Sequence, residues 1–314
     1  MKTSKVAIVI VTFNRRDYVL KNISHVKKLP NSNYDIIIFD NGSTDGTKES
    51  ILENHSEIKY YNSEINLGGA GGFKHGMKIA YDMGFEFIWC LDDDGAPHFD
   101  SLNNLLKEVK NNPNCIYGTR IIPIGASKDA TFWEINGGYD YNLRNYREIS
   151  TQRKNEITSK NITHETASVA LLGLFLHRSV IDIIGYPNEK LFLANDDVEY
   201  CLRAWSKNIP VKLVMTATVE HPPMTIITKK IFGREFSAIK MQPWKMFYYI
   251  RNIVSVNKIY FSYKVYSKMI LGTLLTLIIN IQNDKKETRN YLYKAFLAYK
   301  EGFLNELKLV NKHE

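Results

Sequence analysis

Short strand-like runs alternate with helical patterns along the first 91 residues of the chain. The four runs that fit strands cover residues 6–11, 34–39, 59–62 and 86–91, and the first of them is continuously apolar. Three helical patterns lie between them, at residues 17–28, 47–54 and 72–82. Continuous runs of β-branched residues are typical of strands that are covered on both faces. The order therefore predicts an α/β fold with a doubly wound, mostly parallel sheet.

Polar turns follow these strands directly. They are residues 12–14, 40–43, 66–72 and 92–94. In doubly wound sheets, ligands bind beyond the carboxyl ends of the strands. We therefore expect the four turns to gather at one rim and to form a single site.

The second half of the chain has a weaker pattern. Residues 116–160 form an aromatic-rich stretch that we expect to be an irregular insertion, and apolar order returns at residues 167–176. A strand is predicted at residues 211–219, before Pro222 and Pro223. We place a domain boundary there, which divides the chain into residues 1–222 and a C-terminal extension of residues 223–314.

The C-terminal extension is expected to be helical, amphipathic and basic. Residues 1–222 contain 25 basic and 27 acidic residues, whereas residues 223–314 contain 16 and 6. Such asymmetry suggests an anionic partner, either a membrane surface or a nucleic acid. The most apolar segment, residues 269–281, is shorter than the roughly 20 residues of a membrane-spanning helix, so a core or interfacial helix is expected.

Composition and cysteine usage narrow the class of protein. With 44% hydrophobic and 24% charged residues, the chain is globular rather than disordered or fibrous. Its three cysteines, Cys90, Cys115 and Cys201, form neither a disulfide framework nor a zinc pattern, which favours a reducing cytoplasmic compartment. The apolar N-terminus lacks a small-residue cleavage site and is read as the first strand. No nucleic-acid motif accompanies the basic extension, so no nucleic-acid partner is expected.

The stretch FIWCLDDDGAP places Asp92, Asp93 and Asp94 directly after a buried strand. Adjacent carboxylates raise one another's pKa values, so a positive group is expected beside them. Because successive side chains of an extended segment alternate, Asp92 and Asp94 should point the same way. Two such carboxylates suit Mg²⁺ or Mn²⁺. A solvated acidic turn is the alternative.

Two other turns have both a functional and a purely structural explanation. NLGGAGGF, residues 66–73, matches neither a Walker loop nor a dinucleotide fingerprint. It permits close backbone approach to a sugar or phosphate, or is a plain tight turn. DNGSTDG, which begins at Asp40, consists of turn-forming and capping residues. The Asp40 carboxylate could also accept a hydrogen bond from a nucleobase.

NDDVE, residues 195–199, opens a helix with an apolar face. Asp196 and Glu199 have the spacing of a capping box, which leaves Asp197 without a structural explanation. A carboxylate in the first turn of a helix can act as a general base. His221, in a proline-fixed turn after the last predicted strand, is either structural or a metal ligand.

The ordered set VTFNR, DNGSTDGT, NLGGAGGF, LDDDG, NDDVEYCLRAW and HPP resembles family-two glycosyltransferases of the GT-A fold, over roughly residues 5–222. The combination of NLGGAGGF with LDDD is most similar to galactofuranosyltransferases. Related rhamnosyltransferases share most of these motifs, including an aromatic-Arg-Asn stretch like the one that ends at Asn252.

The resemblance implies a role for each matching position. Asp197 would be the catalytic base, and Asp92, Asp94 and His221 would hold Mn²⁺ or Mg²⁺. The donor-binding set would be Thr12, Asn14, Asp40, Asn66, Gly68, Gly69, Asp92 and Asp93. We also predict that Trp133, in the aromatic stretch, and Asp196 contact the acceptor, with ordinary packing as the alternative for Trp133.

The implied reaction is an inverting, metal-dependent transfer of galactofuranose from UDP-galactofuranose. The expected acceptor is a lipid-linked saccharide of cell-surface polysaccharide synthesis, such as that of O-antigen. The basic extension would hold the protein peripherally on the inner face of the cytoplasmic membrane. The alternatives are a rhamnosyltransferase that uses dTDP-rhamnose and a non-catalytic protein that binds a nucleotide sugar.

Overall fold

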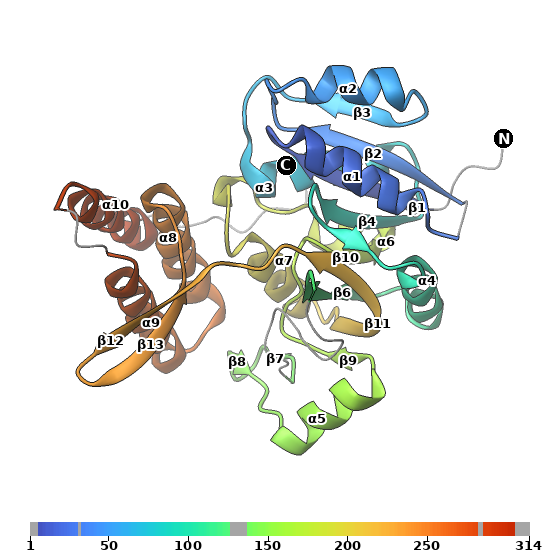
Figure 1. Ribbon diagram of the computed structural model, residues 1–314. Helices are drawn as coiled ribbons and strands as arrows, with labels where there is room; N and C mark the ends of the chain where they lie inside the picture. The colour runs from blue at the N-terminus through green and yellow to red at the C-terminus, as the bar shows by residue number, and fades with distance from the viewer. Residues whose placement is uncertain (1–5, 31–32, 126–136, 282–284, 305–314) are drawn as a thin grey trace.

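The computed structural model describes residues 6–30, 33–125, 137–281 and 285–304 (Figure 1). A nine-stranded sheet lies at its centre. Its strands are β1 (Val6–Thr12), β2 (Tyr34–Asp40), β3 (Lys59–Asn62), β4 (Phe87–Asp92), β5 (Ala96–Pro97), β6 (Ile116–Pro123), β9 (His164–Glu165), β10 (Leu174–His177) and β11 (Val211–His221). The order is β3-β2-β1-β4-β10-β6-β11-β5, and β9 also pairs with β11.

The first four strands of the chain are parallel to one another, as are β6 and β11. β10 runs antiparallel to both of its neighbours, β4 and β6. The α/β class and the mostly parallel sheet predicted from the sequence are therefore confirmed.

Helices cover both faces of this sheet. They are α1 (Arg16–Val26), α2 (Thr47–Asn54), α3 (Gly68–Asp82), α4 (Ser101–Asn111), α6 (Arg178–Ile184) and α7 (Asp196–Trp205), whereas α5 (Thr151–Lys160) lies beyond the sheet and contacts β11 through Ile157 (Figure 1). The side chains of β1 divide between two apolar clusters, because Val9 and Val11 pack with α3 whereas Ile8 and Ile10 pack with α1 and α4. Fully burying one such side chain stabilises the fold by roughly 1.5–3 kcal/mol. Because both faces of β1 are covered, every position along the strand gains from an apolar side chain, which explains its unbroken apolar run.

Helix α3 begins four residues before the predicted start at Gly72, so that prediction was wrong. The glycine-rich run forms the first turn of the helix rather than a turn that precedes it. A Cβ atom at Gly72 would clash with the side chain of Val11, and one at Gly76 would clash with Val9. The glycines thus let α3 approach β1 closely, which helical propensity alone does not indicate.

The stretch of residues 116–160 is more regular than predicted. It contributes β6 to the middle of the sheet, followed by the pair β7 (Tyr139–Asp140) and β8 (Asn145–Tyr146) and by α5. Gly118, Thr119 and Arg120 interrupt the apolar run of β6 and obscure it in the sequence. Gly118 is needed because a Cβ atom there would clash with Val169.

The C-terminal extension begins with a β-hairpin and continues as three helices beside the sheet (Figure 1). The elements are β12 (Ile226–Ile231), β13 (Arg234–Ile239), α8 (Pro243–Tyr260), α9 (Tyr263–Asn280) and α10 (Lys285–Leu304). Phe232 and Gly233 form the two-residue turn of the hairpin, both with positive φ. The helical C-terminus is confirmed, but the hairpin was not predicted. None of the described helices combines the length and hydropathy needed to cross a membrane.

Candidate active site

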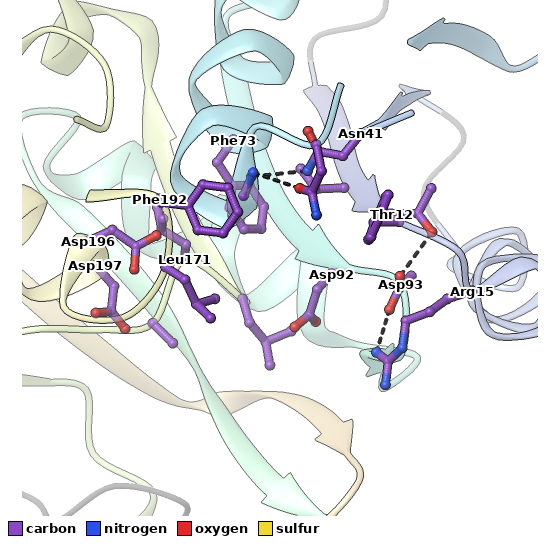
Figure 2. A pocket seen from close by; sticks show the side chains of 18 of the residues that line it. Thr12, Arg15, Asn41, Phe73, Asp92, Asp93, Leu171, Phe192, Asp196 and Asp197 are labelled. Atoms are coloured by element: carbon purple, nitrogen blue, oxygen red, sulfur yellow. Dashed lines mark hydrogen bonds and ion pairs between the residues drawn. The ribbon is translucent and has the colours of Figure 1, made fainter. Parts of the chain in front are cut away.

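A cavity of about 560 Å³ opens at the carboxyl ends of β1 and β4 (Figure 2). The turns after these strands and the start of α3 line one side, and the segment that leads into α7 lines the other. Nine of the residues predicted to form the site line this cavity, namely Thr12, Asn66, Gly68, Gly69, Asp92, Asp93, Asp196, Asp197 and His221. The structure therefore brings the predicted turns together around one hollow.

Arg15 supplies the positive charge expected beside the acidic triplet. Its guanidinium lies 2.8 Å from Asp93 and 2.5 Å from Asp94. The other carboxylate oxygen of Asp93 accepts a hydrogen bond of 2.9 Å from the Thr12 hydroxyl. Thr12 and Asp93 are buried, so this network joins the end of β1 rigidly to the turn after β4 (Figure 2).

Asp92, Asp94 and His221 converge on the opposite side of the triplet. Their ligand atoms all lie within 4.8 Å of one another. His221 Nε2 is 3.1 Å from Asp94 and 3.8 Å from Asp92, while its Nδ1 lies 2.7 Å from the carbonyl of Pro222. A histidine held through its other ring nitrogen is the usual arrangement of a metal ligand.

The charges of this cluster fit a divalent cation. Burial and the charge of Asp94 raise the pKa of Asp92 to about 7, despite the opposing effect of His221. Asp92 Oδ1 is buried and has no hydrogen-bond partner among the described residues. A carboxylate that resists ionisation marks a site that is short of positive charge. Two carboxylates and one imidazole are suitable ligands for Mn²⁺ or Mg²⁺.

Asp94 and His221 stabilise each other's charged forms. Burial opposes ionisation of Asp94, but the hydrogen bond to His221 and the charges of His221 and Arg15 hold the pKa of Asp94 below its usual value. Burial also lowers the pKa of His221, yet the bond to Asp94 and the two carboxylate charges outweigh it and raise that pKa.

Two predicted donor-binding residues, Asn14 and Asp40, are not among the residues that line the cavity. Asp40 is buried, and its two oxygens accept hydrogen bonds from the Ser43 amide at 2.7 Å and the Tyr60 hydroxyl at 2.6 Å. Asn14 Oδ1 accepts a hydrogen bond of 2.7 Å from the backbone amide of Thr44. The backbone amide of Asn14 donates a hydrogen bond of 2.8 Å to the Ser43 hydroxyl. Both side chains shape their turns, and their contact with a nucleoside stays a prediction.

Asp196 and Asp197 stand across the cavity from Asp92, in the first turn of α7 (Figure 2). The capping box predicted for this helix is absent from the described structure, because Asn195 is the N-cap and makes no side-chain cap bond. Glu199 instead binds Arg203, four residues on, at 2.6 and 3.0 Å. That buried ion pair uses the carboxylate that the capping box would need.

The environment of Asp197 suits a general base. Burial raises the pKa of Asp197 to about 6, and burial together with the charge of Asp197 raises that of Asp196. A base is most effective when its pKa lies close to the working pH. Asp197 therefore accepts a proton more readily than an ordinary aspartate and is still ionised at neutral pH.

A second cavity, of about 670 Å³, lies on the other side of the same two carboxylates. The two cavities share Ala170, Leu193, Asp196, Asp197, Met224 and Lys245. Tyr146 and Tyr249 also line the second cavity, and burial with the charge of Asp197 raises the pKa of Tyr146 to about 12. Trp133, predicted to contact the acceptor, lies outside the described residues.

Several lining residues were not anticipated from the sequence. Arg15 lies three residues after Thr12, and its place beside a predicted acidic cluster could have identified it. Phe192, Met224 and Lys245 come from segments whose approach to the cavity depends on tertiary packing. Their local sequence contains no signal for a site.

A family model described as glycosyl transferase family 2 matches residues 7–172. Galactofuranosyltransferase GlfT1 of Mycolicibacterium smegmatis is 26% identical over 232 residues, which cover 74% of this chain and 75% of that protein. The dTDP-rhamnosyl transferase RfbF of Shigella flexneri is 23% identical over 303 residues and is covered over 95% of each chain. A crystal structure of GalNAc-T7 with UDP, GalNAc and Mn²⁺ superposes with a TM-score of 0.61 at 14% identity, over 96% of this chain and 56% of that chain.

Proposed function

The chain belongs to glycosyl transferase family 2 and has the GT-A fold, and on this premise we propose an inverting, metal-dependent galactofuranosyltransferase that uses UDP-galactofuranose. The observation that carries the proposal is the position of Asp197, which lies between two cavities and opposite an acidic cluster. Two substrates could meet at this carboxylate, one from each side. Similarity to GlfT1 supports the choice of sugar.

The first cavity is proposed to bind the donor. Thr12, Asn14 and Asp40 belong to the turns nearest the expected nucleoside, and Asn66, Gly68 and Gly69 border the start of α3. Asn66 Oδ1 accepts a bond of 2.8 Å from the Gly68 amide, which fixes this turn at the N-terminus of a 15-residue helix. Helix N-termini favour negative groups such as a diphosphate.

The metal is proposed to be held by Asp92, Asp94 and His221. A bound divalent cation in such a site acts as a Lewis acid that stabilises the charge on a leaving diphosphate. Arg15 holds the second oxygen of Asp94 at 2.5 Å and Asp93 at 2.8 Å, so these carboxylates keep fixed orientations. Asp93 therefore supports the donor site through its bonds to Arg15 and Thr12.

Asp197 is proposed to take the proton of the acceptor hydroxyl. The hydroxyl oxygen attacks the anomeric carbon on the face opposite the diphosphate and forms the new C–O bond. The bond from the anomeric carbon to the diphosphate oxygen breaks, and its electron pair leaves with the nucleoside diphosphate. Attack from the opposite face inverts the configuration at the anomeric carbon.

The second cavity is proposed to bind the acceptor, a lipid-linked saccharide. Tyr146 and Tyr249 offer aromatic faces to sugar rings, and Lys240 and Lys245 offer positive charge to a phosphate of the lipid carrier. Asp196 lines this cavity beside Asp197 and can accept a hydrogen bond from the acceptor. The role of Trp133 stays a prediction.

A donor screen tests the proposed reaction. We expect the purified protein with Mn²⁺ to consume UDP-galactofuranose at least tenfold faster than UDP-galactopyranose, UDP-glucose or dTDP-rhamnose, because discrimination of a well-bound sugar amounts to several kcal/mol. The measurement is release of the nucleoside diphosphate. Preference for dTDP-rhamnose would favour the alternative that RfbF suggests, and binding without turnover of any donor would favour a non-catalytic sugar-nucleotide sensor.

Peripheral attachment to the inner face of the cytoplasmic membrane is proposed for the C-terminal extension. Twelve of the 23 large apolar side chains exposed in the described structure lie in its helices and hairpin. Phe232, at the hairpin tip, is fully exposed between Lys230 and Arg234. Leu271, Leu274 and Ile278 are exposed on one side of α9. Apolar groups flanked by basic residues suit an anionic lipid surface.

Phe232→Ser is expected to weaken binding to phosphatidylglycerol vesicles by about 10–10²-fold, because insertion of one phenyl ring contributes roughly 1.5–3 kcal/mol. Vesicle flotation at low and high salt measures the loss. Phe99→Ser is the matched control, since Phe99 is 61% exposed outside the extension. Equal recovery of wild type and Phe232→Ser would contradict the role of the hairpin.

A further inference from the structure

The segment that leads into α7 has an unusual backbone. Phe192, Ala194 and Asn195 all have positive φ, between 62° and 66°, although none is a glycine. Such residues persist only where the surrounding structure holds them, and they cluster at functional sites. We call residues 190–195 the base loop, because Asp197 follows it by two residues.

Asn252 of α8 holds the base loop with one side chain. Its Nδ2 lies 2.9, 2.8 and 2.7 Å from the carbonyl oxygens of Leu191, Leu193 and Ala194, so its two N–H groups serve three acceptors and one N–H is shared between two of them. Its Oδ1 accepts a bond of 2.9 Å from Arg251 Nε, which fixes the direction of the amide. Asn252 is fully buried, so these bonds do not exchange with water.

Arg251 and Tyr248 hold the first part of the base loop. Arg251 Nη2 donates to the carbonyls of Lys190 and Leu191, both at 2.9 Å. The Tyr248 ring stacks on Phe192 at 4.6 Å, and the Arg251 guanidinium lies 4.9 Å from the centre of the Tyr248 ring. Tyr248, Arg251 and Asn252 together form what we call the α8 clasp.

The base loop also contacts the donor side of the site. The Phe192 carbonyl accepts a bond of 3.1 Å from the Ala70 amide, in the first turn of α3. A Cβ atom at Gly68 would clash with that same carbonyl. The loop is thus held between α3, which borders the donor cavity, and α8, which belongs to the C-terminal extension.

We propose that Asn252, with Arg251, is a positioning residue that sets the place of Asp197 relative to the donor cavity. This inference rests on the proposed function of Asp197. Asn252 touches neither cavity, and it acts through the backbone of Leu193 and Ala194. Without its three bonds, the positive-φ residues relax and α7 begins in a different place.

Asn252→Ala tests the clasp in the full-length protein. We expect kcat to fall about 10²-fold, because a displacement of about 1 Å can cost that much, while the Kd for UDP with Mn²⁺ stays within about twofold of wild type. Asn257→Ala is the matched control, because Asn257 is a buried asparagine of the same helix whose Oδ1 has no partner among the described residues. Equal losses of kcat in the two variants would overturn the proposal.

Limited trypsin digestion gives a second measurement that does not depend on activity. Lys190 is an exposed residue of the base loop, and cleavage after it is expected to accelerate at least tenfold in Asn252→Ala and not in Asn257→Ala. This result supports the clasp even if the wild type transfers no sugar. Unchanged cleavage in Asn252→Ala overturns it.

Arg251→Lys is a second variant for the case in which Asn252→Ala fails to fold. Lysine keeps the positive charge but lacks the planar guanidinium, whose several N–H groups reach two backbone carbonyls and the Oδ1 atom of Asn252. We expect a roughly tenfold loss of kcat with little change in UDP affinity, and faster cleavage after Lys190. Wild-type kcat and cleavage in this variant would overturn the proposal.

Discussion

Asp197→Asn is expected to lower kcat by about 10²–10⁴-fold, the usual contribution of one general base. Asparagine has the same shape as aspartate but cannot accept the proton of the acceptor hydroxyl. The proposed donor-binding residues lie across the cavity, so the Kd for UDP with Mn²⁺ should stay close to that of wild type. Single-turnover transfer and calorimetric UDP binding measure the two quantities separately.

The pH profile gives the same prediction a second measurement. Because burial raises the pKa of Asp197 to about 6, the base is ionised above this pH and protonated below it. Wild-type kcat should therefore fall as the pH drops through about 6, and the residual rate of Asp197→Asn should lack this acidic limb. Asp17→Asn, at a carboxylate that is 82% exposed in α1, is the control and should match wild type. Turnover of Asp197→Asn at the wild-type rate would dismiss the base assignment.

Removal of the metal is expected to have a comparably large effect. A Lewis acid supplies several kcal/mol of stabilisation to a leaving diphosphate, which corresponds to about 10³-fold in rate. We expect EDTA to lower wild-type transfer by about that factor and added Mn²⁺ to restore it. Asp94→Ala should be slow in both conditions, because it removes one of the three proposed ligands and the nearer of the two carboxylates beside His221.

UDP binding measured with and without Mn²⁺, in wild type and in Asp94→Ala, is the control for the metal prediction. In wild type, UDP affinity should rise when Mn²⁺ is added, whereas in Asp94→Ala it should change little. If EDTA-treated wild type transferred sugar at full rate, then Asp92, Asp94 and His221 would need a different explanation. The bonds from Arg15 would in that case suffice to hold the acidic triplet.

The sequence predicted best where the information is local and periodic. The strand at residues 6–11 was recognisable because every side chain of β1 is buried, on one face or the other. The acidic triplet stood out because it directly follows a strand, whereas His221 was grouped with it only through the family resemblance; in the structure, ligand atoms of Asp92, Asp94 and His221 lie within 4.8 Å of one another. Exact helix starts were harder, since the start of α3 depends on how closely its glycines approach β1.

Sequence reasoning failed where the partner of a residue lies far along the chain. The Glu199–Arg203 ion pair has i, i+4 spacing and could have been read from the sequence, whereas the Tyr260 hydroxyl, 3.2 Å from Glu199, belongs to a residue 61 positions away. The stretch that ends at Asn252 was noticed only as a resemblance, because its three acceptor carbonyls are about sixty residues distant. The spacing of apolar and polar residues along the chain does not reveal contacts between residues that lie so far apart in the sequence.

The walls of the second cavity have a consequence for how proteins of this design can diversify. Met224 and Lys240 flank the hairpin and Tyr249 lies in α8, whereas Ser168 and Val198 come from the part of the chain before residue 222. The boundary that we predict at residue 222 would therefore run through the proposed acceptor cavity. Recombination between relatives near that point would exchange seven of the 17 residues that line this cavity and leave most of the proposed donor cavity unchanged, which offers a direct route to new linkages from the same donor.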